Sequence, residues 1–404
     1  MAEAPALKRI LFVDDEPRVL DGLRRSLRAK RKQWELVFVE NGKAALLELA
    51  RAPFDIIVTD MRMPGMDGAD LLLQAAALQP EAARIVLSGQ TEESAATRAA
   101  TVAHRFLTKP CEPEVLEATL SRTLELRALL ASEQLRQLVG GMAALPSLPS
   151  SCIALNRALG DEHGSLANVC AIVEKDVGMA VKVLQLVNSA FFGVPRRITS
   201  VEHAVSYLGL NTIKNLVLSH SLFAEFGGES LENAERQQTQ ALLSSRIARL
   251  LVPDHQLAQV AATAGLLHDA GSLALASRLP KQHRENAELA KREGTPLHVI
   301  EKARFGVSHA EVGAYLLGLW GLPHDVIEAV AAHHTPWEEL RVFDASAAVR
   351  VAIALAAELT GNDDPSAGAD PPPEDAVARF GIALKLEQIR RELSGSLPKP
   401  TEPS

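Results

Sequence analysis

Five short apolar runs near the N-terminus constrain the fold of this chain more than any other feature. They are Arg9–Val13, Glu35–Val39, Asp55–Thr59, Arg84–Leu87 and His104–Thr108. Runs of this kind are typical of parallel strands that are buried on both faces, and amphipathic helical stretches lie between them. We therefore predict an open α/β sheet of parallel strands.

Polar residues that can bind a phosphate and a magnesium ion follow four of these runs. Asp14 and Asp15 follow the first run, Asp60 the third, Ser88 the fourth and Lys109 the fifth. Ligands of open parallel sheets bind at the carboxyl ends of the strands, so these side chains are expected to converge in one crevice. Taken alone, each residue is better explained by a turn, a helix cap or the end of a strand. The ordered set favours a functional site.

Phosphoryl transfer to a carboxylate is the chemistry that uses this set. Magnesium prefers oxygen ligands and keeps several waters, so Asp15 and Asp60 suit it, with Asp14 close by. Once the metal neutralises the cluster, Asp60 can attack a phosphorus atom and become an acyl phosphate. Lys109 would contact the phosphoryl oxygens as a point charge, and the Ser88 hydroxyl would hydrogen-bond to one of them after transfer.

The segment from the first residue to about Arg127 resembles the receiver domain of bacterial two-component response regulators. The resemblance runs through the motifs VDDEP, VTDMRMPGMDG, LSG and FLTKP. It implies a five-stranded flavodoxin-like fold that a partner sensor histidine kinase phosphorylates on Asp60. It also implies magnesium held by Asp15, Asp60 and the backbone carbonyl of Arg62, with Asp14 beside them.

The same resemblance assigns the residues at the ends of the last two strands. Lys109 and Ser88 stand at the family's conserved Lys and Ser/Thr positions, and Phe106 stands where the family has an aromatic switch residue. No position departs from the pattern in a way that indicates an inactive receiver.

Length and composition call for a second domain and exclude several functions. The 404 residues are too many for one such domain, and the net charge of −8 disfavours a nucleic-acid backbone as partner. No compact basic helix-turn-helix follows the first domain, so we expect no DNA binding. The three cysteines lack paired spacing, and the chain has no signal peptide and no uninterrupted membrane-spanning run. We expect a soluble, cytoplasmic protein without membrane association.

A continuous helix is predicted from Glu114 to Leu138, where it meets Gly140-Gly141. Its apolar residues follow alternating spacings of four and three, as in a coiled-coil seam: Leu124, Ala128, Ala131, Leu135 and Leu138. This favours a homodimer formed through the helix, and the alternative is a helix packed along its own domain. We place the first domain at residues 1–127, a helical linker at 128–141, a second domain at 142–395 and a disordered tail at 396–404.

The second domain is predicted to be all-α. Helical spacing of apolar residues marks Leu166–Glu174, Gly178–Asn188, Val201–Leu208, Thr212–Phe223, Thr239–Leu251, Leu257–Leu267, Ser308–Leu319, Asp325–His333 and Ala345–Glu358. A solvated stretch from Asn362 to Glu374 and a last helix from Ala376 to Leu393 complete it. The motifs LPSLP, DVGM and VNSAFFG, followed by the segment Ile198–Leu210, resemble the HDOD domain, a relative of HD-type metal phosphohydrolases.

A remnant of the HD metal site decides whether the second domain is an enzyme. His268 and Asp269 resemble the HD pair, and further histidines stand where active relatives place them: His309, His333 and His334. Such residues could bind a pair of zinc, iron or manganese ions. An early histidine is missing near Leu243, and a late aspartate is missing where Ala357 stands. We therefore expect a degenerate site without transition metal, whose histidines hydrogen-bond within the helical core.

Three hypotheses for function follow. The first is a response regulator whose phosphorylated receiver controls a non-catalytic HDOD output that binds an unknown protein partner. The second is an enzyme, an HD-type phosphohydrolase that cleaves a phosphodiester such as a cyclic dinucleotide under control of the receiver. The third is a scaffold whose receiver is only a docking surface. The missing His and Asp disfavour the second, and the complete receiver set disfavours the third.

Overall fold

The computed structural model describes most of the chain. The described residues are 7–89, 102–129, 135, 139–142, 144–160, 165–189, 192, 194, 197–218, 224–225, 231–361 and 368–394. The predicted disordered tail and residues 362–367 of the predicted solvated stretch lie outside them. Within the described residues, no helix is long and apolar enough to cross a membrane.

The N-terminal part is a parallel sheet of five strands. These are β1 (Lys8–Val13), β2 (Trp34–Val39), β3 (Ile56–Asp60), β4 (Ala83–Ser88) and β5 (Arg105–Thr108). All pairs are parallel, and the strand order is β2-β1-β3-β4-β5. Every residue of β3 and β4 is buried, as expected for apolar strands covered on both faces. The predicted α/β sheet is confirmed.

Helices connect the strands and place the strand ends. The described ones are α1 (Pro17–Ser26), the 3-10 helix η1 (Leu27–Lys32), α2 (Gly42–Arg51), α3 (Gly68–Leu78) and α5 (Pro113–Leu129). The side chains of Asn41 and Asp67 cap α2 and α3 by accepting hydrogen bonds from backbone N–H groups three residues on. Gly68, the first residue of α3, has no room for a side chain, because a Cβ there would lie 2.2 Å from the backbone oxygen of Asp60. Helix α3 therefore starts directly against the end of β3.

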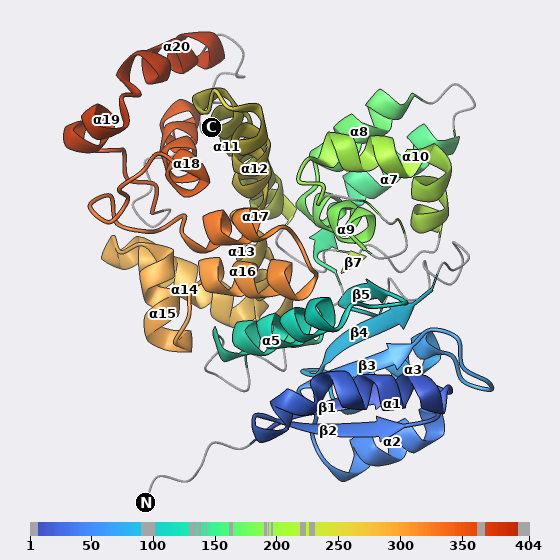
Figure 1. Ribbon diagram of the computed structural model, residues 1–404. Coiled ribbons are helices and arrows are strands. Elements are labelled where there is room, and N and C mark those ends of the chain that lie inside the picture. Colours follow the sequence, from blue (N-terminus) through green and yellow to red (C-terminus); the bar gives the residue numbers. More distant parts are fainter. Residues whose placement is uncertain are drawn as a thin grey trace, which may run out of the picture.

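The rest of the described chain is helical, as predicted, apart from the two-residue strands β6 (Pro146–Ser147) and β7 (Ala224–Glu225). Figure 1 shows one group of helices beside the sheet and a second group above α5. The first group is α7 (Pro149–Gly160), α8 (Leu166–Glu174), α9 (Val177–Val187) and α10 (Val201–Leu218). The second is α11 (Leu231–Leu251), α12 (His255–Leu267), α13 (Ala270–Arg278), α14 (Pro280–Glu293), α15 (Leu297–Phe305), α16 (His309–Leu319), α17 (His324–Ala331), α18 (Ala345–Thr360), α19 (Glu374–Phe380) and α20 (Ala383–Ser394).

Some of the predicted helix boundaries differ from the structure. Helix α11 starts at Leu231, whereas Thr239 was the predicted start. The two helices predicted on either side of Gly209 are confirmed, because non-helical geometry at that residue (φ 74°) divides the element labelled α10. The predicted last helix is wrong as a single element, because Gly381 adopts a left-handed conformation (φ 65°) and ends α19 before α20 begins. Helices α7, α13, α14 and α15 were not predicted.

Helix α5 packs against α16, so the sheet domain and the helical domain share one apolar core (Figure 1). The approach is close: a Cβ on Gly318 of α16 would lie 2.6 Å from a methyl carbon of Leu126 of α5. Leu124 and Leu135, two members of the predicted coiled-coil seam, are buried in this shared core. These two side chains therefore favour the alternative in which the helix packs within its own chain. The side chains of Ala128, Ala131 and Leu138 lie outside the described ones.

Hydrogen bonds cross the same junction. Gln185 of α9 donates to the backbone oxygen of His104 (3.1 Å). Next to the junction, the Trp320 indole at the end of α16 donates to the backbone oxygen of Met142, the first residue after the linker (3.2 Å). An Arg122 guanidinium nitrogen of α5 lies 3.1 Å from Nδ1 of His324 on α17. The last strand and last helix of the sheet domain thus contact the helical domain directly.

Candidate functional site

The four predicted charged residues at the strand ends converge. Lys109 Nζ lies 2.6 Å from Oδ2 of Asp14 and 2.9 Å from Oδ1 of Asp60, so its ammonium bridges the two carboxylates. Asp14, Asp15 and Asp60 each offer a carboxylate oxygen, and these oxygens lie within 4.8 Å of one another. Because β1 and β3 are neighbours in the sheet, residues far apart in the sequence meet at one edge.

The electrostatics of this acidic cluster depend on Lys109. Burial raises the pKa of Asp60, the Lys109 ammonium opposes this, and the Asp14 carboxylate adds to the rise, so that the pKa stays above its ordinary value. Burial alone would lower the pKa of Lys109, but Asp14 and Asp60 offset it and raise that pKa. Three carboxylates with one ammonium leave a net negative site, which suits a hard divalent cation with oxygen ligands. Asp14, Asp15 and Asp60 fit magnesium on this ground.

The remaining predicted residues lie around the cluster. Ser88 ends β4 and is buried, and its hydroxyl donates to the backbone oxygen of Gly89 (3.1 Å). A cavity of about 430 Å³ opens beside the cluster, lined by Asp15 and by residues 61–64 and 67. Arg62, whose backbone carbonyl is the predicted third ligand, is part of that lining. That ligand and the Ser88 contact to a phosphoryl group stay predictions.

Phe106 lies in the interior of the protein. Its side chain is 5% exposed and belongs to a buried apolar cluster that also contains Leu186 of α9. The same cluster includes Val102 and Ala103, which precede β5. The residue at the predicted switch position therefore occupies a core that the two domains share.

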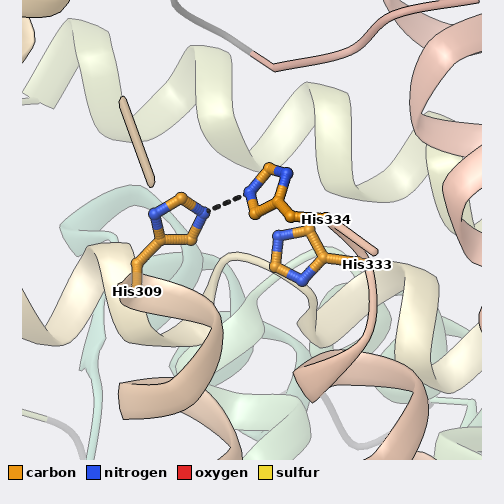
Figure 2. A group of neighbouring side chains, drawn as sticks. All are labelled: His309, His333 and His334. Atoms are coloured by element: carbon orange, nitrogen blue, oxygen red, sulfur yellow. Dashed lines mark hydrogen bonds between the residues drawn. The ribbon is translucent and has the colours of Figure 1, made fainter. Parts of the chain in front are cut away.

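A second cluster lies in the helical domain and contains the predicted histidines. Figure 2 shows His309, His333 and His334 side by side, and Nε2 of His309 lies 2.9 Å from Nε2 of His334. Asp269 lies next to them, with Oδ1 3.4 Å from Nε2 of His309 and Oδ2 3.3 Å from Nε2 of His268. The structure thus brings together all five residues of the predicted remnant.

Each of three histidines is fixed through its Nδ1 atom. His268 and His333 donate Nδ1–H to the backbone oxygens of Gly265 (2.7 Å) and Val330 (2.6 Å). His309 donates Nδ1–H to Glu301 (2.6 Å), whose carboxylate is fully buried and also accepts the backbone N–H of His309 (2.8 Å). The Nε2 atoms therefore face one another, an arrangement that metal-binding histidines also use.

Glu301 and His298 also belong to this cluster and were not predicted from the sequence. Both lie on α15, three residues apart and hence on one helix face, and the His298 ring stacks on His334 with centroids 3.9 Å apart. A carboxylate directly after two apolar residues, Val299 and Ile300, was the available signal.

A proton accounts for the close approach of the His309 and His334 rings. The Glu301 carboxylate raises the pKa of His309 to about 9, against the opposing effect of burial, so His309 is an imidazolium near neutral pH. Burial lowers the pKa of His334 well below its ordinary value, so its ring is neutral and can accept from Nε2–H of His309. Two nitrogens bound to tetrahedral zinc would lie about 3.3 Å apart, whereas 2.9 Å is an ordinary hydrogen-bond length.

The side chains of this cluster do not supply enough ligands for two metal ions. His309, His333 and His334 together could offer three nitrogens to one ion. The positions that should supply a ligand from α11 and from α18 hold the buried apolar residues Leu243 and Ala357. The residues present therefore do not fit the two-metal site of a hydrolase.

Both halves of the chain match known family models. Residues 10–121 match the response regulator receiver domain, and residues 145–336 match the HDOD domain. Among curated proteins, an uncharacterized protein of Treponema pallidum (strain Nichols) is 30% identical over 229 residues, which cover 54% of this chain and 44% of that one. The hydrogenase transcriptional regulatory protein HoxA of Cupriavidus necator is 33% identical over 122 residues, which cover 30% of this chain and 25% of that one. The chain thus spans less than half of the length of either relative.

Solved structures are similar to parts of the chain. A virulence factor of Campylobacter jejuni subsp. jejuni has 22% identity and a TM-score of 0.48, with 66% of this chain and 97% of that one covered. The signal receiver domain of an HD domain-containing protein of Pseudomonas fluorescens Pf-5 has 27% identity and a TM-score of 0.29, with 30% of this chain and 98% of that one covered.

The buried His309–Glu301 pair gives the helical domain a defined dependence of stability on pH. Because the folded-state pKa of His309 (about 9) exceeds the ordinary 6.5, its stabilisation is complete below about pH 6.5 and is lost as the pH rises through about 9. We expect the free energy of unfolding from urea titrations to fall by roughly 3 kcal/mol over this window. His309→Gln should cost about 3 kcal/mol at pH 6.5, because it leaves a carboxylate buried and unpaired.

The double variant His309→Gln/Glu301→Gln is the matched control and should recover part of that loss, since it removes both charges. Stoichiometric metal in elemental analysis would contradict the protonated pair. So would a stability that rises with pH and is lost on adding EDTA, because metal ligands must be deprotonated.

Proposed function

Because this chain carries an N-terminal response regulator receiver domain and a C-terminal HDOD domain, we propose that a histidine kinase phosphorylates Asp60 with Mg²⁺ and so controls a non-catalytic output. The observation that carries the proposal is the Lys109 ammonium held between Asp14 and Asp60 at hydrogen-bond distance. In this arrangement the attacking carboxylate, the cation that will face the phosphoryl oxygens and the acidic metal ligands are already in place.

The proposed reaction transfers a phosphoryl group to Asp60. A carboxylate oxygen of Asp60 attacks the phosphorus of the donor phosphohistidine, and the P–N bond to the imidazole breaks as the P–O bond forms. Asp14, Asp15 and Asp60 would hold magnesium, which would supply positive charge for the phosphoryl group. Lys109 then pairs with the phosphoryl oxygens, and the Ser88 hydroxyl at the end of β4 would exchange its bond to the backbone oxygen of Gly89 for one to a phosphoryl oxygen.

The output is proposed to bind proteins rather than to hydrolyse a phosphodiester. The two-metal chemistry of hydrolases needs ligands on both sides of the ion pair, and Leu243 and Ala357 provide none. A protonated His309 between Glu301 and His334 also engages two of the three histidines that could otherwise bind one ion. The output partner is then a protein that recognises the surface of the HDOD domain, and no transition metal is required.

Coupling between the domains is proposed to run along β5. Lys109 follows this strand and contacts Asp60. Phe106, within the strand, shares a buried cluster with Leu186 of the HDOD domain, and the backbone oxygen of His104, just before the strand, accepts a hydrogen bond from Gln185. A phosphoryl group adds charge and strong acceptors beside Lys109 and Ser88. A shift of β5 would therefore change the packing of α9, and two packings a few kcal/mol apart suffice for a switch.

Phosphorylation of Asp60 is the first prediction of this proposal. Incubation with a small-molecule phosphodonor and Mg²⁺ should give an acyl phosphate, seen as a mass increase that hydroxylamine removes. Asp60→Asn should abolish it because the amide is not a nucleophile, whereas Asp21→Asn on the exposed face of α1 should label like wild type. Equal labelling of Asp60→Asn and wild type would contradict the assignment of Asp60 as the phosphoacceptor.

Transmission to the output is the second prediction. A phosphoryl mimic bound with Mg²⁺ should alter hydrogen exchange of α5, α9 and α16, which line the junction between the domains. Phe106→Ala should weaken the response in α9 while leaving phosphorylation itself intact. Exchange changes confined to the receiver in wild-type protein would show that the two domains act independently.

A further inference from the structure

A cavity of about 490 Å³ lies where the receiver meets the HDOD domain, away from both the acidic cluster and the histidine cluster. Helix α5 and strand β5 form one wall, and α16, α17 and the segment before α10 form the other. Neither the phosphoryl-transfer chemistry nor the histidine cluster uses these residues. The volume falls within the range of small-molecule sites in proteins.

Three arginines from three separate segments line this cavity. Arg105 comes from β5, Arg122 from α5 and Arg197 from the chain before α10, and His324 at the start of α17 joins them. Among the described residues, no carboxylate comes within ion-pair distance of Arg105 or Arg197. Arg122 has only a long contact to Glu125 (3.7 Å) beside its contact to His324. Arg197 donates to the backbone oxygen of Gly321, which orients its guanidinium without neutralising it.

The clustering of these cations is unfavourable for the protein alone. Burial lowers the pKa of Arg105 to about 10, and repulsion from Arg197 and Arg122 contributes to the shift. Guanidinium groups that lose water without gaining a carboxylate are costly unless an anion is supplied from outside. Phosphate is the anion that several guanidiniums bind best, since each offers a planar fork of donors.

The rest of the lining is apolar. Val115, Ala118 and Leu126 line the receiver side, and Leu322 and Ile327 line the HDOD side. Val115 is 51% exposed although it is a large apolar side chain, so this wall is open to a ligand. An inorganic anion would leave such a wall uncovered, whereas a planar base attached to a phosphate would cover it.

We propose that this cavity binds a nucleotide, with its phosphate on Arg105, Arg122 and Arg197 and its base against the apolar wall. The ligand would contact both domains at once. It would therefore stabilise the packing of α5 and β5 against α16 and α17, the same junction through which the receiver acts on the output. The inference goes beyond the phosphorylation of Asp60 and does not depend on it.

The test is isothermal titration calorimetry of the full chain in the Asp60→Asn background with EDTA present, so that neither phosphorylation nor magnesium at the receiver contributes. The probes are AMP, GMP, inorganic phosphate and adenosine. We expect saturable 1:1 binding of AMP or GMP that weakens with added salt, at least tenfold weaker binding of phosphate, and none of adenosine.

Arg105→Gln and Arg197→Gln should each weaken nucleotide binding by tenfold or more. Arg197 is exposed, so its variant should fold even if Arg105→Gln does not. Arg292→Gln on the exposed surface of α14 removes the same charge away from the cavity and should bind like the parent. The proposal is overturned if no nucleotide binds, if phosphate binds as well as the nucleotides, or if binding survives in Arg197→Gln.

Discussion

Strand β5 is in contact with both halves of the molecule, and the other contacts between the halves are arranged around it. At its carboxyl end, the Lys109 ammonium bridges Asp14 and Asp60. Along and before it, Phe106 shares a buried cluster with Leu186 of α9, and the backbone oxygen of His104 accepts from Gln185. A close-packed interior transmits small displacements because it has few voids to absorb them. Changes at Asp60 therefore have a short route to the output.

The packing of α5 on α16 supports this strand from the other side. The absence of a side chain at Gly318 lets Leu126 approach, and Gly140 similarly lies between Tyr315 and Glu81, where a Cβ would be 3.3 Å from the Tyr315 hydroxyl. Small residues at such crossings permit contacts that a larger side chain would prevent. The arginine-lined cavity borders this crossing, so the junction combines an apolar core with one accessible cationic site.

The histidine cluster is a different case, in which side chains from separate helices form a hydrogen-bonded group. Glu301 fixes His309, and backbone carbonyls fix His268 and His333. Leu243 and Ala357, which stand where the family resemblance predicts two further ligands, are buried and apolar.

The sequence was sufficient for features set by local pattern, and insufficient for those set by long-range placement. The receiver sheet was predictable because its strands are continuous apolar runs. Its site was predictable because charged or hydroxyl side chains directly follow or end four of the strands. Helix α14 was missed since its sequence, PKQHRENAELAKRE, has almost no apolar face. The pairing of Glu301 with His309 and the meeting of Arg105, Arg122 and Arg197 depend on how separate helices pack, which no periodicity encodes.

The central claim is that the state of Asp60 is sensed at the junction with the HDOD domain. Trp320 reports on that junction, because its buried indole donates to Met142 where α16 ends. A variant with Trp34→Phe and Trp337→Phe keeps Trp320 as the only tryptophan of the three in the sequence. Its fluorescence emission should shift when a phosphoryl mimic and Mg²⁺ are added, and should stay unchanged when Asp60→Asn is also present. An unchanged spectrum with the mimic demonstrably bound to Asp60 would contradict the account.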